Sequence, residues 1–108
     1  MDQQPRRSIA SRSLLYSVAG MSAKKAFTVC IGEPYLLTDG SVDFGFAPGT
    51  AGCSISFIGL PEKPEIVYGA DGIQALELAI AAMESYLRRL RRKYEFFFPE
   101  DGELYFQD

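Results

Sequence analysis

Residues 68–94 read YGADGIQALELAIAAMESYLRRLRRKY and hold the clearest structural signal in this chain of 108 residues. Asp71, followed three positions later by Gln74, has the spacing of a capping box, in which side chains satisfy free backbone groups at a helix start. Apolar residues then recur at steps of three and four, the period of an α-helix. These residues are Ile73, Leu76, Ile80, Met83, Leu87, Leu90 and Tyr94. The segment therefore predicts a long amphipathic helix.

The apolar arc of this helix is wider than one sheet covers. It extends over roughly 220°, whereas a helix on one face of a sheet needs an apolar stripe of a little over about 100°. We expect the larger side chains to pack on the sheet, namely Ile73, Leu76, Ile80, Met83 and Leu87. The positions left for a second surface are Ala75, Leu78, Ala82 and Tyr86. That surface fits the N-terminal residues, the C-terminal tail or a second copy of the chain, and we expect a homodimer.

The residues before the helix show the two-residue period of β-strands. Alternating apolar side chains predict strands at residues 26–31, 42–46, 53–58 and 65–68. Turn signals such as Asp39-Gly40 separate them, which is typical of consecutive antiparallel strands. The predicted fold is α+β: an antiparallel β-meander of about four strands, with one long helix from the C-terminal half of the chain packed across one face.

Both ends of the chain differ in composition from the middle. Residues 1–23 are rich in arginine and serine and are predicted to form an N-terminal arm, in which Leu14, Tyr16 and Val18 alternate as in an edge strand of this chain or a neighbour. Residues 24–108 are predicted to form a single α+β domain. Its tail carries five aromatic and five acidic side chains after Tyr94. Because exposed aromatic residues favour aggregation, we expect the tail to fold back on the domain or to dock across an oligomer.

The residue types argue against an enzyme or a metal site. The chain has no histidine and only two cysteines, Cys30 and Cys53, which lie in separate predicted strands. They lack the spacing of zinc ligands and a neighbouring base for nucleophilic catalysis. We therefore predict no enzymatic activity, no cofactor and two reduced thiols. No apolar run approaches the roughly 20 residues that span a bilayer, and none has the pattern of a secretory signal, so we expect a cytoplasmic protein.

The strongest charged feature is a basic run at the end of the helix. It consists of Arg88, Arg89, Arg91, Arg92 and Lys93. Such a run can form an anion or nucleic-acid patch. Cations at a helix C-terminus also oppose the macrodipole by about 0.3 to 1 kcal/mol each, and here an acidic tail follows. The chain carries a net charge of -3. Nucleic-acid binding is therefore an alternative that we favour less.

A small-ligand-binding protein is a further alternative. It requires a concave pocket between the sheet and the helix. The aromatic residues available to line it are Tyr35, Phe44, Phe57 and Tyr68. The same residue types more often fill a hydrophobic core, so we place this alternative behind an interaction protein.

The segment Tyr68-Gly69-Ala70-Asp71-Gly72-Ile73-Gln74-Ala75-Leu76, which follows a meander and opens a single helix, resembles a family of small uncharacterised bacterial α+β proteins. The resemblance covers roughly residues 24–98 and implies this fold, with no assigned activity. The small size and the unusual tail also resemble orphan proteins carried on integron gene cassettes. The N-terminal arm and the aromatic acidic tail depart from the family pattern.

We interpret the sequence as a small non-enzymatic interaction or accessory protein that self-associates. Its partner surface is predicted where the surplus apolar arc of the helix meets the basic run and the aromatic tail. The residues of this surface are Leu78, Tyr86, Arg89, Lys93, Phe97 and Phe98.

Overall fold

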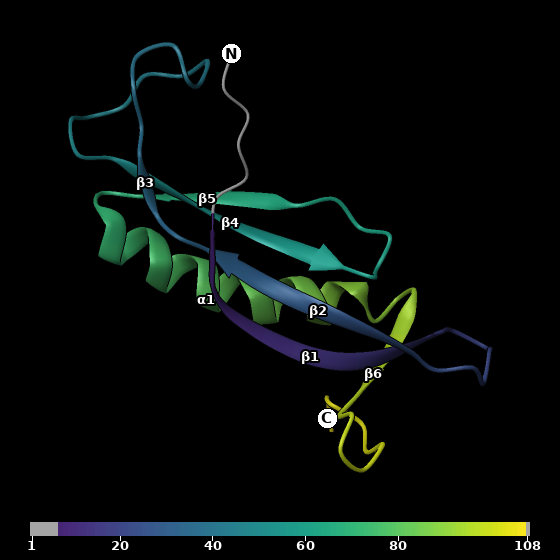
Figure 1. Ribbon diagram of the computed structural model, residues 1–108. Helices are drawn as coiled ribbons and strands as arrows, with labels where there is room; N and C mark the ends of the chain where they lie inside the picture. Colours follow the sequence, from purple (N-terminus) through teal and green to yellow (C-terminus); the bar gives the residue numbers. More distant parts are fainter. Residues whose placement is uncertain (1–6, 108) are drawn as a thin grey trace.

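A computed structural model describes residues 7–107 of the chain (Figure 1). The strands within these residues are β1 (Ser8–Val18), β2 (Lys25–Gly32), β3 (Tyr35–Leu36), β4 (Ala51–Ile58), β5 (Glu65–Gly69) and β6 (Tyr94–Phe97). The helix α1 (Gly72–Leu90) packs against β4 and β5 on one face of the antiparallel sheet. The predicted α+β class is confirmed, with six strands in place of about four.

β1 lies inside the sheet over part of its length. It pairs with β2 from Ser8 to Tyr16, and along its other edge it pairs with β6 from Leu15 to Val18. Leu14 and Tyr16 are buried in the core, as their alternation indicates, whereas Val18, the third residue of the pattern, is 50% exposed. The described part of the predicted arm is thus a strand of the sheet, and it is an edge strand only up to Leu14.

β4 has partners along both of its edges. Gly52 pairs with Tyr35 of β3 and with Tyr68 of β5, so β3 and β5 lie on opposite sides of β4. At Ile55 the same argument places β2 opposite β5. β2 and β3 therefore follow one another along the same edge, interrupted next to Pro34, which has no N–H to donate to a ladder.

The start of α1 matches the predicted cap. Asp71 Oδ1 accepts a hydrogen bond of 2.8 Å from the Gln74 N–H, and Gln74 Oε1 accepts one of 2.6 Å from the Ala70 N–H. The helix ends at Leu90 instead of continuing to Tyr94, because Tyr94 already belongs to β6. Pairing with β1 thus overrides the helical period at this end.

The smaller residues of α1 form much of the face that meets the sheet. Ala75 and Ala79 are fully buried, whereas Ile73 and Ile80 are 73% and 51% exposed. The expectation that these two isoleucines pack on the sheet, and that Ala75 faces elsewhere, is wrong. The other large residues do pack against the core, namely Leu76, Met83 and Leu87. α1 approaches β5 so closely at Gly69 that a Cβ atom there would lie 2.4 Å from the Ala75 backbone nitrogen, and such a close contact favours small side chains on the facing side of the helix.

The predicted strand at residues 42–46 is not formed. Residues 37–50 instead make a long connection between β3 and β4, with positive φ angles of 83° and 91° at Gly40 and Gly49. An additional strand needs a sheet edge to pair with, and both edges of β4 are already taken. Phe44, predicted to lie in this strand, is exposed.

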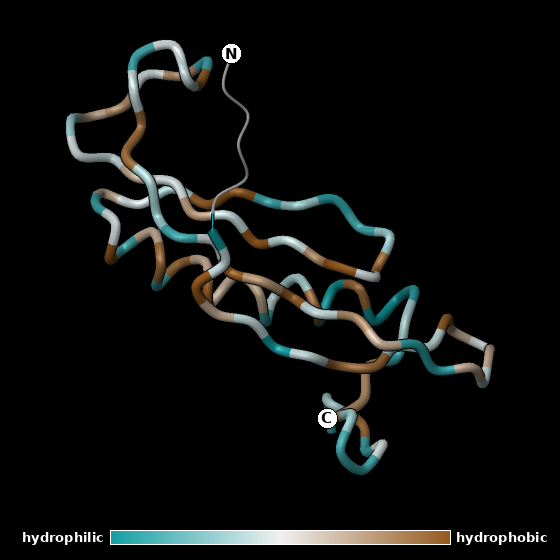
Figure 2. The backbone as a smooth tube through the Cα atoms, in the orientation of Figure 1, coloured by the Kyte–Doolittle hydropathy of each residue, from teal (hydrophilic) through white to brown (hydrophobic). Residues whose placement is uncertain are grey.

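β6 and the tail close one end of the core. Phe96 and Phe106 are buried, and the Tyr105 N–H donates a hydrogen bond of 2.8 Å to the Phe96 carbonyl. Figure 2 shows that hydrophilic residues gather in the connection between β4 and β5 and in the C-terminal turn, while hydrophobic residues recur along the strands and α1. Of the two arrangements expected for the tail, folding back on its own domain is the one observed.

Candidate functional site

A cavity of about 210 Å³ lies between the C-terminal end of α1 and the sheet. Three half-buried residues, all packed against the core, form its apolar wall: Phe57, Tyr86 and Leu90. Its rim carries four cations and two carboxylates: Lys63, Arg89, Arg92, Lys93, Glu62 and Glu65. We call this feature the cationic cavity. It joins the end of the helix to the connection between β4 and β5.

Tyr86 is fixed in the cationic cavity by two charged neighbours. Its hydroxyl donates a hydrogen bond of 2.8 Å to Glu65 Oε1, and the Arg89 guanidinium carbon lies 4.7 Å from the centre of its ring. Burial, together with the hydrogen bond to Glu65, raises the pKa of Tyr86 above its ordinary value. Tyr86 therefore stays protonated and acts as a hydrogen-bond donor and a stacking surface.

Glu62 receives two donors at the edge of the same cavity. The Tyr94 hydroxyl and the Lys93 ammonium donate to its Oε2, at 2.8 Å and 3.1 Å. Burial alone raises the pKa of Glu62, but the hydrogen bonds from Tyr94 and Lys93 outweigh it, so the pKa is lowered. Burial and the bond to Glu62 raise the pKa of Tyr94 to about 12. Glu62 therefore has a structural role, because its carboxylate accepts hydrogen bonds from Tyr94 and Lys93.

The predicted partner surface is only partly assembled. Tyr86, Arg89 and Lys93 come together around the cationic cavity. Leu78 is exposed on an earlier turn of α1. Phe97 is buried, with the Lys24 ammonium 4.1 Å from the centre of its ring.

Phe98, the last residue of the predicted partner surface, is also far from the cationic cavity. It is half-buried and packs against Tyr105, with ring centres 5.1 Å apart. Phe98 lines a different pocket with Glu84 and Arg88 of α1, and Phe97 is paired with Leu15 of β1, so neither joins Tyr86, Arg89 and Lys93.

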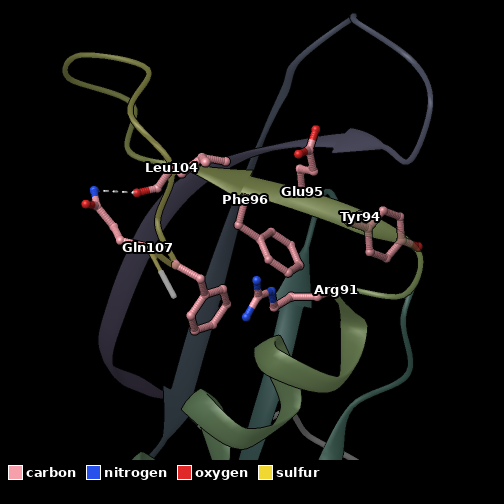
Figure 3. A pocket seen from close by; sticks show the side chains of 7 residues that line it. Arg91, Tyr94, Glu95, Phe96, Leu104 and Gln107 are labelled. Carbon is pink, nitrogen blue, oxygen red and sulfur yellow. Dashed lines mark hydrogen bonds between the residues drawn. The ribbon is translucent and has the colours of Figure 1, made fainter.

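The basic run is divided between two places. Arg88 and Arg91 lie over the Phe106 ring, at 4.7 Å and 5.2 Å from its centre, and so hold the C-terminal tail. A second cavity lies between Arg91, strand β6 and the C-terminal tail, and Figure 3 shows Arg91 beside Phe96 in it. Arg89, Arg92 and Lys93 line the cationic cavity instead. The five cations therefore do not form one continuous patch.

Three of the four predicted pocket aromatics gather on the face of the sheet opposite α1. Tyr35 and Tyr68 both pair with Gly52, and the Phe44 ring packs edge-on against Tyr68 at 5.1 Å. A Cβ atom on Gly52 would lie 2.7 Å from the Tyr35 ring, so this ring lies across the glycine. Only Phe57 faces the helix, in the wall of the cationic cavity. The four residues do not share one pocket.

The second candidate feature is the unpaired edge of β1, residues 8–14, which we call the β1 edge. β6 covers the other edge of β1 only from Leu15 onward, and the chain then turns away after Phe98 through Pro99. The Ala19 N–H donates to the Lys93 carbonyl at 2.8 Å, so alternate residues from Ala19 backward point their backbone groups toward the β6 side. Within residues 7–107, no strand pairs with this edge.

An apolar cavity of about 170 Å³ lies beside the β1 edge, between the sheet and α1. Its lining is mostly aliphatic: Ala10, Val29, Ile31, Ile80 and Met83, with Ser11 and Arg12. Arg12 Nη1 lies 3.3 Å from Glu84 Oε1 of the helix and donates to the Tyr105 hydroxyl at 2.5 Å. Tyr105 in turn donates to Glu84. These contacts hold the Arg12 charge on the helix side of β1.

Both cysteines are buried thiols. Burial raises the pKa of Cys53, and its Sγ lies 3.2 Å from the Gly32 carbonyl, to which it donates. Among residues 7–107, no three His, Cys, Asp or Glu side chains are grouped as metal ligands. Over the same residues, no helix combines the length and the apolar character that spanning a membrane requires.

Comparison of the chain with models of known protein families, with curated proteins and with solved structures finds no match. The resemblance to small bacterial α+β proteins therefore stays a prediction.

Proposed function

We propose that this protein is a small non-enzymatic interaction protein that self-associates by pairing its β1 edge with the β1 edge of a second copy. The observation that carries the proposal is that one edge of β1 is paired with β2, while β6 does not reach the other edge from Ser8 to Leu14. Unpaired strand edges are templates for a further strand, and proteins usually protect them with proline, lysine or a covering loop. Neither proline nor lysine occurs in this stretch; its register is irregular between Ser8 and Ala10, and its one charged residue, Arg12, is paired with Glu84.

The chemistry of the β1 edge suits pairing with itself. Two identical strands in antiparallel register are related by a two-fold axis, which gives a closed dimer. Ser11 and Ser13 point their backbone groups outward and have small, exposed side chains, so a second strand can approach to the usual spacing of about 4.8 Å. Arg12 and its symmetry mate lie near the axis, and the ion pair with Glu84 in each copy offsets their repulsion.

The apolar surface beside the edge supports the same arrangement. Ile9 and Ile80 are 42% and 51% exposed, and Ile80 and Met83 line the aliphatic cavity next to β1. A second copy docked on β1 shields part of this surface from water, which stabilises association by about 25 cal/mol per Å² of apolar area. Backbone hydrogen bonds then fix the antiparallel orientation of the two β1 strands, and burial of apolar surface adds to the affinity of the dimer.

The nucleic-acid alternative has less support. Arg88 and Arg91 are engaged with Phe106, and the remaining cations of the basic run face the cationic cavity with its two glutamates. A duplex needs a continuous row of cations along its phosphates. We also propose a cytoplasmic location, because free buried thiols such as Cys30 and Cys53 are common in the reducing cytoplasm.

The test is the absolute mass in solution, measured by light scattering after size-exclusion chromatography. We expect the full chain to be a dimer. The double variant Ser11→Lys with Ser13→Lys places four ammonium groups close to the two-fold axis and should be a monomer. Its matched control is Ala81→Lys with Ser85→Lys, which adds the same charge at exposed positions of α1 and should stay a dimer.

Circular dichroism tests whether the variants are folded, and both should retain the spectrum of the full chain. A monomeric Ser11→Lys, Ser13→Lys variant with that spectrum has lost the interface and not the fold. A monomeric full chain, or a folded Ser11→Lys, Ser13→Lys variant that is still a dimer, would overturn the proposal.

A further inference from the structure

We propose that the cationic cavity binds a small phosphate monoester that carries an apolar body, such as one aromatic ring. The cationic cavity includes Glu65 of β5, at one side of the sheet, and β1 lies toward the other side. This inference therefore does not depend on self-association through the β1 edge.

The charges around the cavity match a dianion. Its lining holds four cations and two carboxylates, which leaves an excess of two positive charges. Lys93 is paired with Glu62 at 3.1 Å, and Glu65 accepts the hydrogen bond from Tyr86. Among the ion pairs of residues 7–107, none involves Lys63 or Arg92. A phosphate monoester carries close to two negative charges at neutral pH and offers three acceptor oxygens.

The helix dipole accounts for only part of this arrangement. Arg89, Arg92 and Lys93 follow one another at the end of α1, where cations oppose the partial negative charge of the free carbonyl groups. Lys63 comes from the connection between β4 and β5 and is not part of the helix. Its presence on the same rim brings cations from two elements to one cavity, which is the arrangement that holds a multiply charged anion.

The apolar wall of the cationic cavity favours a phosphate monoester whose organic group is an apolar ring. Phe57, Tyr86 and Leu90 are half-buried and offer ring faces and a branched chain below the cationic rim. The Tyr86 ring is already covered on one side by Arg89. A volume of about 210 Å³ is enough for one ring with its phosphate. Apolar walls with a few convergent polar groups are the usual composition of small-molecule sites.

The experiment is a titration with phenyl phosphate, followed by amide chemical shifts of the full chain and by calorimetry. We expect saturable binding that weakens with added salt, with shifts confined to residues around the cavity. Phenol, which lacks the charge, and inorganic phosphate, which lacks the ring, should each bind at least about tenfold more weakly.

Substitutions then assign the site. Lys63→Gln with Arg92→Gln should weaken phenyl phosphate binding by about tenfold or more. The matched control is Arg7→Gln with Lys24→Gln, which removes the same charges away from the cavity and should leave the affinity unchanged. The inference is overturned by the absence of saturable binding, by equal binding of inorganic phosphate, or by equal loss in both double variants. Light scattering of the Lys63→Gln, Arg92→Gln variant should still give the mass of the full chain, which separates this result from self-association.

Discussion

Gly69 of β5 lies directly against Ala75 in the first turns of α1: a Cβ atom on Gly69 would be 2.4 Å from the Ala75 backbone nitrogen. Non-bonded carbon and nitrogen atoms normally stay about 3.5 Å apart. The strand and the helix therefore touch at a point where β5 has no side chain. This contact turns Ala75 and Ala79 toward the sheet and leaves Ile73 and Ile80 at the exposed side of the helix.

Replacing this glycine should separate the helix from the strand. We expect Gly69→Ala to lower the free energy of unfolding by about 1 to 3 kcal/mol or more, because the backbone of α1 has to move away from the added methyl group. The measurement is urea unfolding followed by circular dichroism. Gly45→Ala is the control, since a Cβ there meets no atom within 4 Å, and it should stay within about 0.5 kcal/mol of the original chain. Equal stability of the two variants would contradict the close approach.

The start of the helix could be predicted from neighbouring residues. The buried face of the helix and the absence of a strand at residues 42–46 depend on contacts between distant segments and could not be predicted in this way. The cap formed by Asp71 and Gln74 involves neighbours in the chain, so their spacing was sufficient. The buried face of α1 depends on Gly69, and no period within the helix encodes that contact. The strand expected at residues 42–46 had the right alternation, but both edges of β4, the next strand in the chain, are occupied by β2, β3 and β5.

The cap itself should contribute measurably to stability. Asp71→Ala removes the acceptor of the Gln74 N–H and should lower the free energy of unfolding by about 1 kcal/mol. Asp43→Ala, in the exposed connection between β3 and β4, removes the same charge and should have little effect. Chemical unfolding of both variants measures the difference. A loss equal to that of Asp43→Ala would show that the side chain of Asp71 does not cap the helix.

The helical period predicts only part of the division of the basic run. Arg89 is rotated by about 100° from Arg88, but α1 ends at Leu90, so the period does not determine where Arg91, Arg92 and Lys93 point. The contribution of Lys63 to the cationic cavity could not be predicted in the same way, because the turn after β4 alone brings it to the helix. The candidate site was thus predictable only for the part that belongs to one element.

The tail should depend on the two arginines that lie over Phe106. Phe106→Leu keeps an apolar side chain but removes the ring that Arg88 and Arg91 cover, so we expect a loss of about 1 to 2 kcal/mol in the free energy of unfolding. The control is Phe44→Leu in the exposed connection after β3, which should change stability less. Limited proteolysis after residue 98 gives a second readout, since a loosened tail is cut faster. Unchanged stability and cleavage would contradict this role of Phe106.

A cysteine placed on the β1 edge should report the geometry of the dimer. Ser11→Cys lies close to the expected two-fold axis, where Cα atoms of paired residues are about 5.5 Å apart, within the range that a disulfide spans. Mild oxidation should give a covalent dimer on a non-reducing gel, because the native thiols Cys30 and Cys53 are buried and do not compete. Ser85→Cys, exposed on α1, should stay monomeric on the same gel. Equal cross-linking at both positions would indicate random collision instead of a β1 interface.

The pH dependence of stability should reveal Glu62. Its pKa is lowered in the folded chain, where the hydrogen bonds from Tyr94 and Lys93 outweigh burial, so at acid pH the unfolded state binds a proton more readily than the folded state. The resulting stabilisation is fully present above the ordinary glutamate pKa of about 4.3 and disappears as the pH falls through the lower folded value. Because the Lys93 ammonium is largely exposed, we expect the contribution to be no more than about 1 kcal/mol.

Glu62→Gln is the variant that isolates this effect. It should be less stable than the original chain at pH 7, and the difference should shrink as the pH is lowered below about 4, because the original chain then loses the same charge. Urea unfolding at a series of pH values measures both curves, and Glu77→Gln, an exposed carboxylate of α1, provides the comparison. A stability difference between Glu62→Gln and the original chain that stays constant down to pH 3 would mean that the hydrogen bonds from Tyr94 and Lys93 do not depend on the charge of Glu62.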